Sequence, residues 1–395
     1  MITITKKSKC CGCCACASSC PKQCISMVSD GEGFWYPQVQ EADCIGCGLC
    51  EKVCPVLHDR GTDNAPMAYA AYHRDVEIRM ESSSGGVFTL FAELILRRGG
   101  VVFGARFDER FQVVHDYTET VEGLSRFRGS KYLQSRIGSA YNRAREFLMQ
   151  GRTVLFSGTP CQIAGLRAFL GKEYDNLYCL DIICHGVPSP KVWERYLAQQ
   201  EDRAASKAQS VSFRSKAEGW KRFCMTIAFE NKEVYCRLFS EDAFMRAFLR
   251  DLCLRPSCYD CAFKKLNRES DATLADFWGI EAVAPEMNDD KGTSLLIINS
   301  EKGKRLLESV AETLVLQPVE LEKAISGNPA MLRSARPNAK RSAFFAGVES
   351  ADFAELVELC YYENPVKKRL RRLVNTGKAL LYTGAKALFR IAEKK

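Results

Sequence analysis

The chain has 395 residues, of which 46% are hydrophobic and 26% are charged, and its formal net charge is +8. At about 150 residues per domain this length predicts two to three domains, and the composition excludes a disordered chain. The longest run without a charged residue, 153–166, is shorter than the ~20 residues that a membrane-spanning helix needs. The first residues lack the apolar stretch of a signal peptide, so the sequence predicts a cytoplasmic protein.

The cysteines are concentrated at the start of the chain, where 11 of the 20 lie before residue 55. Two stretches share the spacing C-x2-C-x2-C-x3-C followed by proline: Cys10, Cys13, Cys16 and Cys20 before Pro21, and Cys44, Cys47, Cys50 and Cys54 before Pro55. This spacing is typical of bacterial ferredoxins that bind 4Fe–4S clusters. Structural zinc is the alternative, but zinc sites favour two C-x2-C pairs separated by a longer loop.

In such a run the first three thiolates bind one cluster and the fourth reaches the other cluster. The sequence therefore predicts one cluster on Cys10, Cys13, Cys16 and Cys54, and a second on Cys44, Cys47, Cys50 and Cys20. Cys11, Cys14 and Cys24 fall outside this spacing and are interpreted as small buried hydrophobic residues. A hairpin of 25–29 and 34–39 separates the two runs, so residues 1–57 are expected to form a small two-cluster ferredoxin module.

After a polar linker, residues 67–205 alternate between strand and helix patterns, which predicts an α/β region with a largely parallel sheet. Strands are expected at 67–72, 101–107, 112–117, 153–156 and 177–183, and helices at 87–96, 138–150, 162–170 and 191–200. Residues 206–320 form a second part, with strands at 211–213, 223–229, 233–238, 273–277 and 294–299 and a helix at 241–249. Beyond residue 301 we expect mostly helix, and residues 321–395 are predicted to be a helical region with a basic amphipathic tail. The fold class of the whole chain is predicted to be α+β.

Three places in these two parts have the residue types of a ligand site. Ser82-Ser-Ser-Gly-Gly86 precedes a helix and suits either a bound phosphate or a simple helix cap. Gly129-Ser-Lys-Tyr132 is either a binding loop or a solvated basic loop. Cys161, Cys184, Cys258 and Cys261 could hold a third cluster, whereas the alternative is a zinc or redox C-x2-C pair beside two buried thiols. Cys253 is a spare candidate ligand.

The order of these motifs resembles the coenzyme F420 hydrogenase/dehydrogenase beta-subunit family over roughly residues 5–320. The resemblance is carried by the ferredoxin-like start together with Ser83-Ser-Gly-Gly-Val-Phe88, Gly129-Ser-Lys-Tyr132, Gly158-Thr-Pro-Cys-Gln162, Cys184-His-Gly-Val-Pro-Ser189, Arg255-Pro-Ser-Cys-Tyr-Asp-Cys261 and Ala275-Asp-Phe-Trp-Gly279. It implies an α/β flavin-binding domain that holds FAD and carries a 4Fe–4S cluster near it. The sequence departs from the minimal family member by carrying the ferredoxin-like module.

Several residues are implicated only by this resemblance. Ser84, Gly85 and Gly86 would contact the flavin phosphates, and Lys131 would lie near the flavin or its hydride partner. Gly158 and Thr159 are further cofactor-binding candidates in the same motifs. Cys161, Cys184, Cys258 and Cys261 would bind the third cluster, which the resemblance favours over zinc. No catalytic base is predicted, because hydride transfer belongs to the cofactors.

The function expected from these patterns is that of an iron–sulfur flavoprotein oxidoreductase. It would pass electrons between ferredoxin-type clusters and, through a flavin, a soluble hydride carrier (F420, NAD(P)H or another) or a small acceptor. Ferredoxin or another redox protein is the expected protein partner. The alternative is an electron-transfer adaptor without substrate chemistry of its own, serving for example a polysaccharide-synthesis pathway. A zinc-stapled protein that binds nucleic acid is disfavoured by the double ferredoxin spacing.

The positive charge lies almost entirely in the last 30 residues. Residues 366–395 hold ten Lys and Arg against one Glu, a net +9, whereas the remaining 46 basic and 47 acidic residues sum to −1. Apolar residues alternate with these cations, so a basic amphipathic helix could lie peripherally on the inner face of a membrane. A helix packed on the body with a solvated basic face is the alternative.

Overall fold

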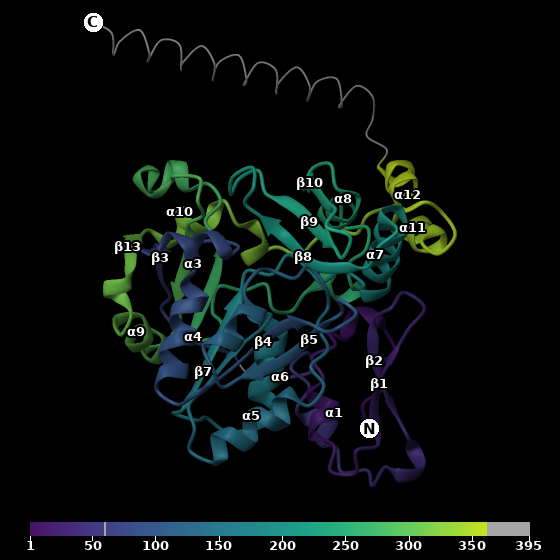
Figure 1. Ribbon diagram of the computed structural model, residues 1–395. Coiled ribbons are helices and arrows are strands. Elements are labelled where there is room, and N and C mark those ends of the chain that lie inside the picture. The colour runs from purple at the N-terminus through teal and green to yellow at the C-terminus, as the bar shows by residue number, and fades with distance from the viewer. Residues whose placement is uncertain (59–60, 362–395) are drawn as a thin grey trace, which may run out of the picture.

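The computed structural model describes residues 1–58 and 61–361 of the chain (Figure 1). The predicted basic tail and its membrane contact therefore lie outside the described residues. No helix among the described residues is long and apolar enough to cross a lipid bilayer.

The first 58 residues form a small unit, which we call the head. Its two strands, β1 (Ile25–Ser29) and β2 (Trp35–Val39), pair antiparallel with Ile25 opposite Val39, as the sequence predicts. Asp30 closes the turn by accepting the backbone N–H groups of Glu32 and Phe34, each at 3.0 Å. The short helices α1 (Ala15–Ser19) and α2 (Leu49–Lys52) lie within the two cysteine runs, and η1 (Lys7–Lys9) and η2 (Glu41–Asp43) precede the runs.

The head is held against the rest of the chain, which we call the body. Arg341 donates two hydrogen bonds, of 2.7 and 2.6 Å, to the carboxylate of Glu32 at the hairpin tip. The Ser189 hydroxyl donates to the Glu32 carbonyl at 2.5 Å. Figure 1 shows the head, in purple, beside α6 (Pro160–Leu170) and below α11 (Arg341–Gly347). These contacts fix the cysteine-rich loops of the head relative to the body.

The body is built on one mixed sheet of eight strands in the order β13-β3-β12-β11-β7-β6-β4-β5. Its strands are β3 (Met67–His73), β4 (Val101–Phe107), β5 (Val113–Thr118), β6 (Val154–Ser157), β7 (Leu177–Ile182), β11 (Ala272–Asp276), β12 (Ser294–Ile298) and β13 (Leu314–Val319). The pairs β4–β6, β6–β7 and β7–β11 are parallel, and the other four pairs are antiparallel. The expectation of a largely parallel sheet is therefore wrong outside the four central strands. The parts predicted at 67–205 and 206–320 share this one sheet.

Successive side chains of a strand point to opposite faces of a sheet, and apolar side chains on both faces of this sheet are covered by helices. Val102 and Leu155 pack with α4 (Val87–Arg97) and α9 (Glu301–Glu308) on one face. Phe103 and Phe156 pack with α5 (Ala140–Met149) and α6 on the other face, where Ala15 of the head joins the same core. Further along that second face, strands β3 and β12 pack against α10 (Leu321–Ser326) and two short turns, η5 (Ile280–Ala282) and η6 (Pro285–Met287).

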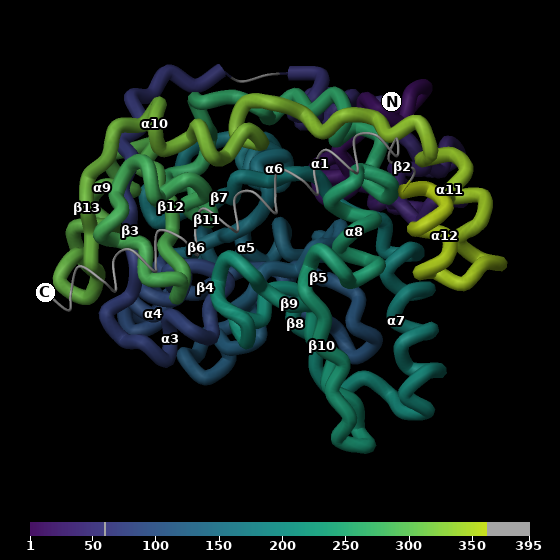
Figure 2. Tube along the Cα trace, turned by 90° about the horizontal axis from the view of Figure 1, so that it is seen from above, coloured from purple at the N-terminus to yellow at the C-terminus, as the bar shows by residue number. Residues whose placement is uncertain are grey.

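A second sheet of three antiparallel strands stands beside the first. It has the order β10-β9-β8 and consists of β8 (Ala208–Ser215), β9 (Cys224–Phe229) and β10 (Val234–Leu238). Its core of Trp193, Tyr196, Phe213 and Phe244 joins α7 (Pro190–Ala204), α8 (Ala243–Leu249), α11 and α12 (Phe353–Cys360). Figure 2 shows this sheet and α7 extending to one side of the main sheet.

Two elements of the structure were not expected from the sequence. The strand β13 lies in a region predicted to be mostly helical, and α3 (Val76–Glu81) precedes the Ser82–Gly86 loop. β13 contains Pro318 and lies at the edge of the sheet, where β3 is its one partner strand among the described residues. An edge position tolerates proline, because one side of the strand has no ladder to interrupt.

Candidate redox site

The cysteines of the head line two separate cavities. One cavity is lined by Cys10, Cys13, Cys16 and Cys54, together with Cys11 and Cys14. The other is lined by Cys20, Cys44, Cys47 and Cys50, together with Cys24. Each cavity thus takes three cysteines from one run and the last cysteine of the other run. This is the grouping that two 4Fe–4S clusters require.

The loops around both cavities have the backbone conformation that a cluster loop needs. Gly12 and Gly46 occupy matching positions in the two runs, with φ of +72° and +67°. Glycine takes such angles without the steric cost that a side chain carries. The Ile2 backbone N–H also points at the Cys50 sulfur at 3.3 Å, which is a direct hydrogen bond to a candidate ligand. The head therefore fits two clusters in both thiol supply and loop shape.

The two head cavities differ in their access to solvent. Cys47 is exposed, and Ile45 beside it is 60% exposed. The cavity that contains Cys10 lies toward the body, because Cys13 and Cys14 belong to the core shared with α6. An electron would therefore enter or leave the head most readily at the Cys47 side.

A second set of cysteines gathers in the body at the carboxyl ends of the parallel strands. Cys161 follows β6 at the start of α6, and Cys184 follows β7. Cys258 and Cys261 come from the turn η4 (Pro256–Asp260) and the residue after it. Adjacent parallel strands end at one edge of a sheet, which is where α/β proteins place ligands.

The four body thiols are close enough to influence one another. Burial raises the pKa of Cys184 to about 12, and repulsion from Cys161 and Cys261 adds to this shift. Burial also raises the pKa of Cys258, with further contributions from Cys184, Cys261 and Cys161. The structure thus brings together the four cysteines that the sequence singled out. Among the described residues, no group of three or more His, Cys, Asp or Glu converges tightly enough to hold a single metal ion.

Cys11 connects the head to this second set. Its pKa is raised well above the usual value, first by its interaction with Cys13 of the head, while its interaction with Cys161 of the body acts in the opposite direction. Sequence reasoning interpreted Cys11, Cys14 and Cys24 as small buried residues. Cys14 and Cys24 are each 8% exposed, which agrees with that interpretation. Cys11 instead stands at the boundary between the two cysteine sets.

The predicted phosphate loop and the predicted basic loop contact each other. The Ser130 backbone N–H donates to the Ser83 hydroxyl at 2.7 Å. Gly86 caps α4 with a φ of +88°. The Gly85 N–H is already used, since it donates to the Ser294 hydroxyl at 2.9 Å. Ser84 donates to the Thr293 carbonyl at 3.0 Å, which ties the loop to the start of β12.

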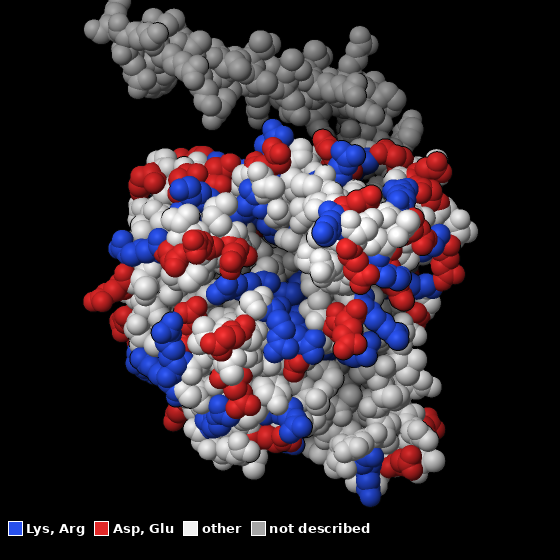
Figure 3. Space-filling view, viewed as in Figure 1, with Lys and Arg blue, Asp and Glu red and all other residues white. Residues whose placement is uncertain are grey.

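Two basic residues that sequence reasoning missed surround this loop. Lys216 donates to the backbone carbonyls of Arg79, Ser84 and Lys291 at 2.6, 2.8 and 2.7 Å, and burial lowers its pKa to about 7. Arg214 pairs with Asp276 at 2.7 Å. Arg214 lies near the end of β8, and Lys216 directly follows that strand. Figure 3 shows Lys and Arg side chains gathered over the middle of this face of the molecule.

The basic group has unused hydrogen-bonding capacity. The Nε atoms of Arg128 and Arg214 are buried and have no hydrogen-bond partner among the described residues. Lys131 is held by the carbonyls of Arg128 and Gly129 at 2.9 and 3.1 Å, and burial lowers its pKa to about 7. Buried donors of this kind are costly unless an acceptor fills the space. An anionic group such as a phosphate fits that requirement.

Gly158 and Thr159 lie beside the body thiols. Thr159 caps α6 through Gln162, whose side-chain oxygen accepts the Thr159 N–H at 2.9 Å. The Thr159 hydroxyl is 3.1 Å from the Cys161 sulfur. The Gly158 N–H donates to the Leu180 carbonyl at 3.0 Å. The N–H groups of these two residues are therefore engaged within the protein.

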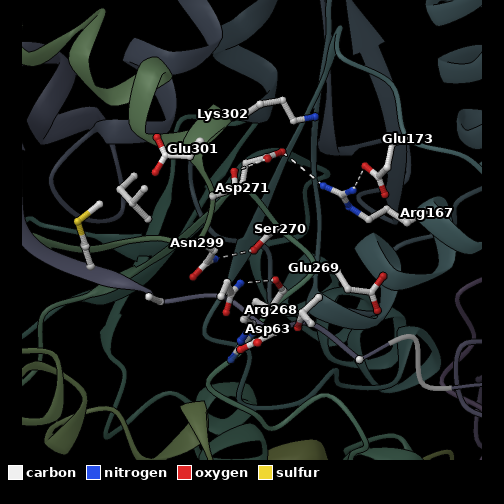
Figure 4. Close-up of a pocket in the computed structure, with 17 residues that line it drawn as sticks. Asp63, Arg167, Glu173, Arg268, Glu269, Ser270, Asp271, Asn299, Glu301 and Lys302 are labelled. Atoms are coloured by element: carbon white, nitrogen blue, oxygen red, sulfur yellow. Dashed lines mark hydrogen bonds and ion pairs between the residues drawn. The ribbon is translucent and has the colours of Figure 1, made fainter.

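A pocket of about 650 Å³ lies elsewhere, at the amino ends of β3 and β11 (Figure 4). Its wall includes Arg167, which pairs with Glu173 at 2.6 Å and with Asp271 at 3.7 Å. None of the residues that the sequence predicts to bind a cofactor lines it. This pocket and the body cysteines thus lie at opposite ends of the parallel strands.

Comparisons with known proteins match both parts of the chain. Residues 151–324 match the family described as the carboxy-terminal part of the coenzyme F420 hydrogenase/dehydrogenase beta subunit, and residues 9–57 match the 4Fe-4S dicluster domain. Residues 151–324 are thus related to the beta subunit of F420 hydrogenases and dehydrogenases, and residues 9–57 to dicluster ferredoxin domains. The chain is an iron–sulfur electron-transfer protein with a ferredoxin-like head.

Two individual proteins are also similar. A ferredoxin of Saccharopolyspora erythraea is 38% identical over 58 residues, which are 15% of this chain and 50% of that protein. The chain thus spans half the length of this curated relative. A chain of the F420-reducing [NiFe] hydrogenase complex from Methanosarcina barkeri is 17% identical, with a TM-score of 0.46 over 68% of this chain and 88% of that chain.

Proposed function

We propose that this protein is an iron–sulfur flavoprotein oxidoreductase. It exchanges electrons one at a time with a redox protein at the exposed side of the head, and two at a time with a soluble hydride carrier or small acceptor at the body. The match of residues 151–324 to the carboxy-terminal part of the F420 hydrogenase/dehydrogenase beta subunit supports an oxidoreductase. The flavin, the ligands and the carrier are part of the proposal.

The observation that carries the proposal is the packing of the head cysteines on α6, where a Cβ atom on Gly165 would lie 2.8 Å from the Cys13 Cβ atom and 3.0 Å from its sulfur. Since Cys161 begins the same helix, the head and its two cluster cavities lie against the four body cysteines. We assign Cys10, Cys13, Cys16 and Cys54 to the first cluster and Cys20, Cys44, Cys47 and Cys50 to the second. Cys161, Cys184, Cys258 and Cys261 are assigned to a third. The three sites then form a path from the surface at Cys47 to the interior of the body.

A flavin would be held by the loop residues Ser84, Gly85 and Gly86 and by Lys131, with Arg214 and Lys216 added from the structure. Support comes from the unpartnered Nε atoms of Arg128 and Arg214 among the described residues, which suit a phosphate. A flavin supplies the chemistry that links single electrons to a hydride. The protein's part is to bind and orient it, to neutralise phosphate charge and to exclude water.

Iron, sulfide and flavin quantitation on anaerobically purified protein tests this function. Three 4Fe–4S clusters correspond to ~12 iron atoms per chain and two to ~8. The proposal expects ~12 together with one flavin. A protein that contains iron but no flavin would be an electron-transfer adaptor, which is the other function that the head explains equally well.

Matched cysteine variants locate the third cluster. Cys261→Ser should lower the iron content by about four atoms and leave the head clusters in place. Cys253→Ser is the control, because Cys253 is fully buried in the aromatic core of the second sheet. Equal iron contents in the two variants and the wild type would refute the third-cluster assignment.

A further inference from the structure

One buried cation lies between the head and the body cysteines. The Arg255 side chain is 0% exposed and ranks among the largest fully buried side chains of the protein. Its guanidinium donates to the Cys10 carbonyl at 2.8 Å, to the Trp35 carbonyl at 2.9 Å and to the Gln134 amide oxygen at 3.0 Å. It also approaches the Cys10 sulfur at 3.6 Å.

The charge of Arg255 has no carboxylate to balance it among the described residues. Its side-chain hydrogen-bond partners there are two backbone carbonyls, one amide oxygen and one thiol. An unpaired charge is costly to bury, so buried charges are paired in folded proteins. A cluster bound by four thiolates has a net negative charge, and Cys10 would supply one of those thiolates. A cluster on Cys10 would therefore supply the negative charge that Arg255 lacks among the described residues.

The surroundings of Arg255 are shaped to hold it in this place. A Cβ atom on Gly12 would stand 3.0 Å from the Arg255 Cζ and Nη1 atoms, so glycine at this position lets the guanidinium approach the loop. The Tyr36 ring lies 4.2 Å from the guanidinium. The backbone carbonyl of Arg255 accepts the Cys258 N–H at 2.9 Å. One residue thus contacts a head ligand through its side chain and a body ligand through its backbone.

We propose that Arg255 is a positioning residue that raises the reduction potential of the cluster held by Cys10, Cys13, Cys16 and Cys54. This rests on the proposed function, since it requires that the clusters be present. Each cluster takes up one electron and gains one negative charge, and no bond is broken. A positive charge and an N–H···S bond stabilise the reduced form, because cluster potentials depend on net charge, hydrogen bonds and solvent exposure.

The second head cluster provides an internal reference. Among the described residues, no Lys or Arg side chain donates a hydrogen bond to Cys20, Cys44, Cys47 or Cys50. Arg255 therefore acts on only one of the two head clusters. The expected consequence is that removal of the Arg255 charge changes the midpoint potential of the inner cluster and leaves that of the outer cluster unchanged.

A redox titration with dithionite, followed by electron paramagnetic resonance of anaerobically purified protein, tests this. In Arg255→Met the midpoint potential of the cluster held by Cys10 should fall. At the wild-type midpoint the ratio of reduced to oxidised cluster should drop at least tenfold, which corresponds to about 59 mV for one electron. Arg255→Lys keeps the charge and loses the planar fork, so a smaller drop is expected. The other head cluster should keep its midpoint.

Gln134→Glu is a second variant that leaves Arg255 in place. Gln134 is 4% exposed, and its replacement has nearly the same shape but presents a carboxylate to the guanidinium. Gln134→Glu should lower the midpoint potential of the cluster held by Cys10. This variant tests the role of Arg255 even if Arg255→Met fails to fold. Unchanged midpoints at full iron content, or equal shifts of both head clusters, would overturn the role of Arg255. Wild-type protein without iron would instead refute the proposed function.

Discussion

The two glycines Gly12 and Gly46 allow the packing of the head on the body to be measured separately from loop strain. They occupy matching positions in the two cysteine runs and have nearly equal φ angles of +72° and +67°. Alanine at either position costs about 1–2 kcal/mol, because the left-handed region crowds its Cβ atom. A Cβ on Gly46 has no neighbour within 4 Å, whereas one on Gly12 collides with Gln134 and Arg255.

This difference predicts unequal effects of the two substitutions. Overpacking adds about 1–3 kcal/mol, so Gly12→Ala should destabilise the head by about 2–5 kcal/mol and Gly46→Ala by about 1–2 kcal/mol. Urea titrations that follow cluster absorbance under anaerobic conditions give the comparison. For a unit as small as the head, with an m-value of ~1 kcal/mol/M, the two midpoints should differ by about 1–3 M. Coincident midpoints would show that Gln134 and Arg255 do not pack tightly against Gly12.

Three further predictions concern residues of the body, two of them with a reference substitution elsewhere in the chain. Asp181→Asn breaks a buried ion pair with Arg268, whose charged atoms are 3.2 Å apart, and should lower the free energy of unfolding by about 3–5 kcal/mol. Glu146→Gln breaks an exposed pair with Arg143 and should lower it by less than ~1 kcal/mol. Equal unfolding midpoints of the two variants would contradict this difference. Gly327→Ala places a Cβ atom against the Trp278 carbonyl, although the φ of −78° is itself ordinary for alanine. Denaturant unfolding should show a loss of about 1–3 kcal/mol in the free energy of unfolding. Gly31→Ala should cause no loss, because a Cβ atom there has no neighbour within 4 Å. Burial lowers the pKa of His115 to about 4 in the folded protein, whereas in the unfolded chain the pKa is ~6.5. As the pH falls, the unfolded chain therefore binds a proton at this histidine before the folded protein does. The free energy of unfolding should fall by about 1.4 kcal/mol per pH unit between pH ~6.5 and 4. His115→Gln should remove this dependence, and a wild-type-to-variant difference that stays constant from about pH 7 to 5.5 would disprove it.

The local patterns predicted most elements of the chain. The ferredoxin spacing, the hairpin at 25–39 and the strands and helices from 67 to 249 depend on neighbours in sequence, and the structure confirms those elements within a few residues. The strand β13 was missed because Pro318 argues against a strand, and only pairing with β3 at the sheet edge makes it one.

The candidate site was predictable only in part. Thiols separated by two or three residues identify a cluster loop because their spacing is local. The approach of Cys161, Cys184, Cys258 and Cys261 depends on the strand order, which residue patterns do not state. Arg255 belongs to a motif that the sequence contains, but its contact with Cys10 is between residues that are 245 positions apart in the chain. Contacts over such separations are a property of the tertiary structure.

The position of β3 also has a consequence for how the chain is made. This first strand of the body lies between β12 and β13, so both of its partners, residues 294–319, are synthesised more than 200 residues later. Non-local pairing of this kind is slow and leaves strand edges open until it is complete. The head can leave the ribosome long before Arg255 and Arg341 exist to receive it. A fragment that ends before β12 would leave β3 without either partner, so the body cannot be divided at residue 205 into halves that fold separately.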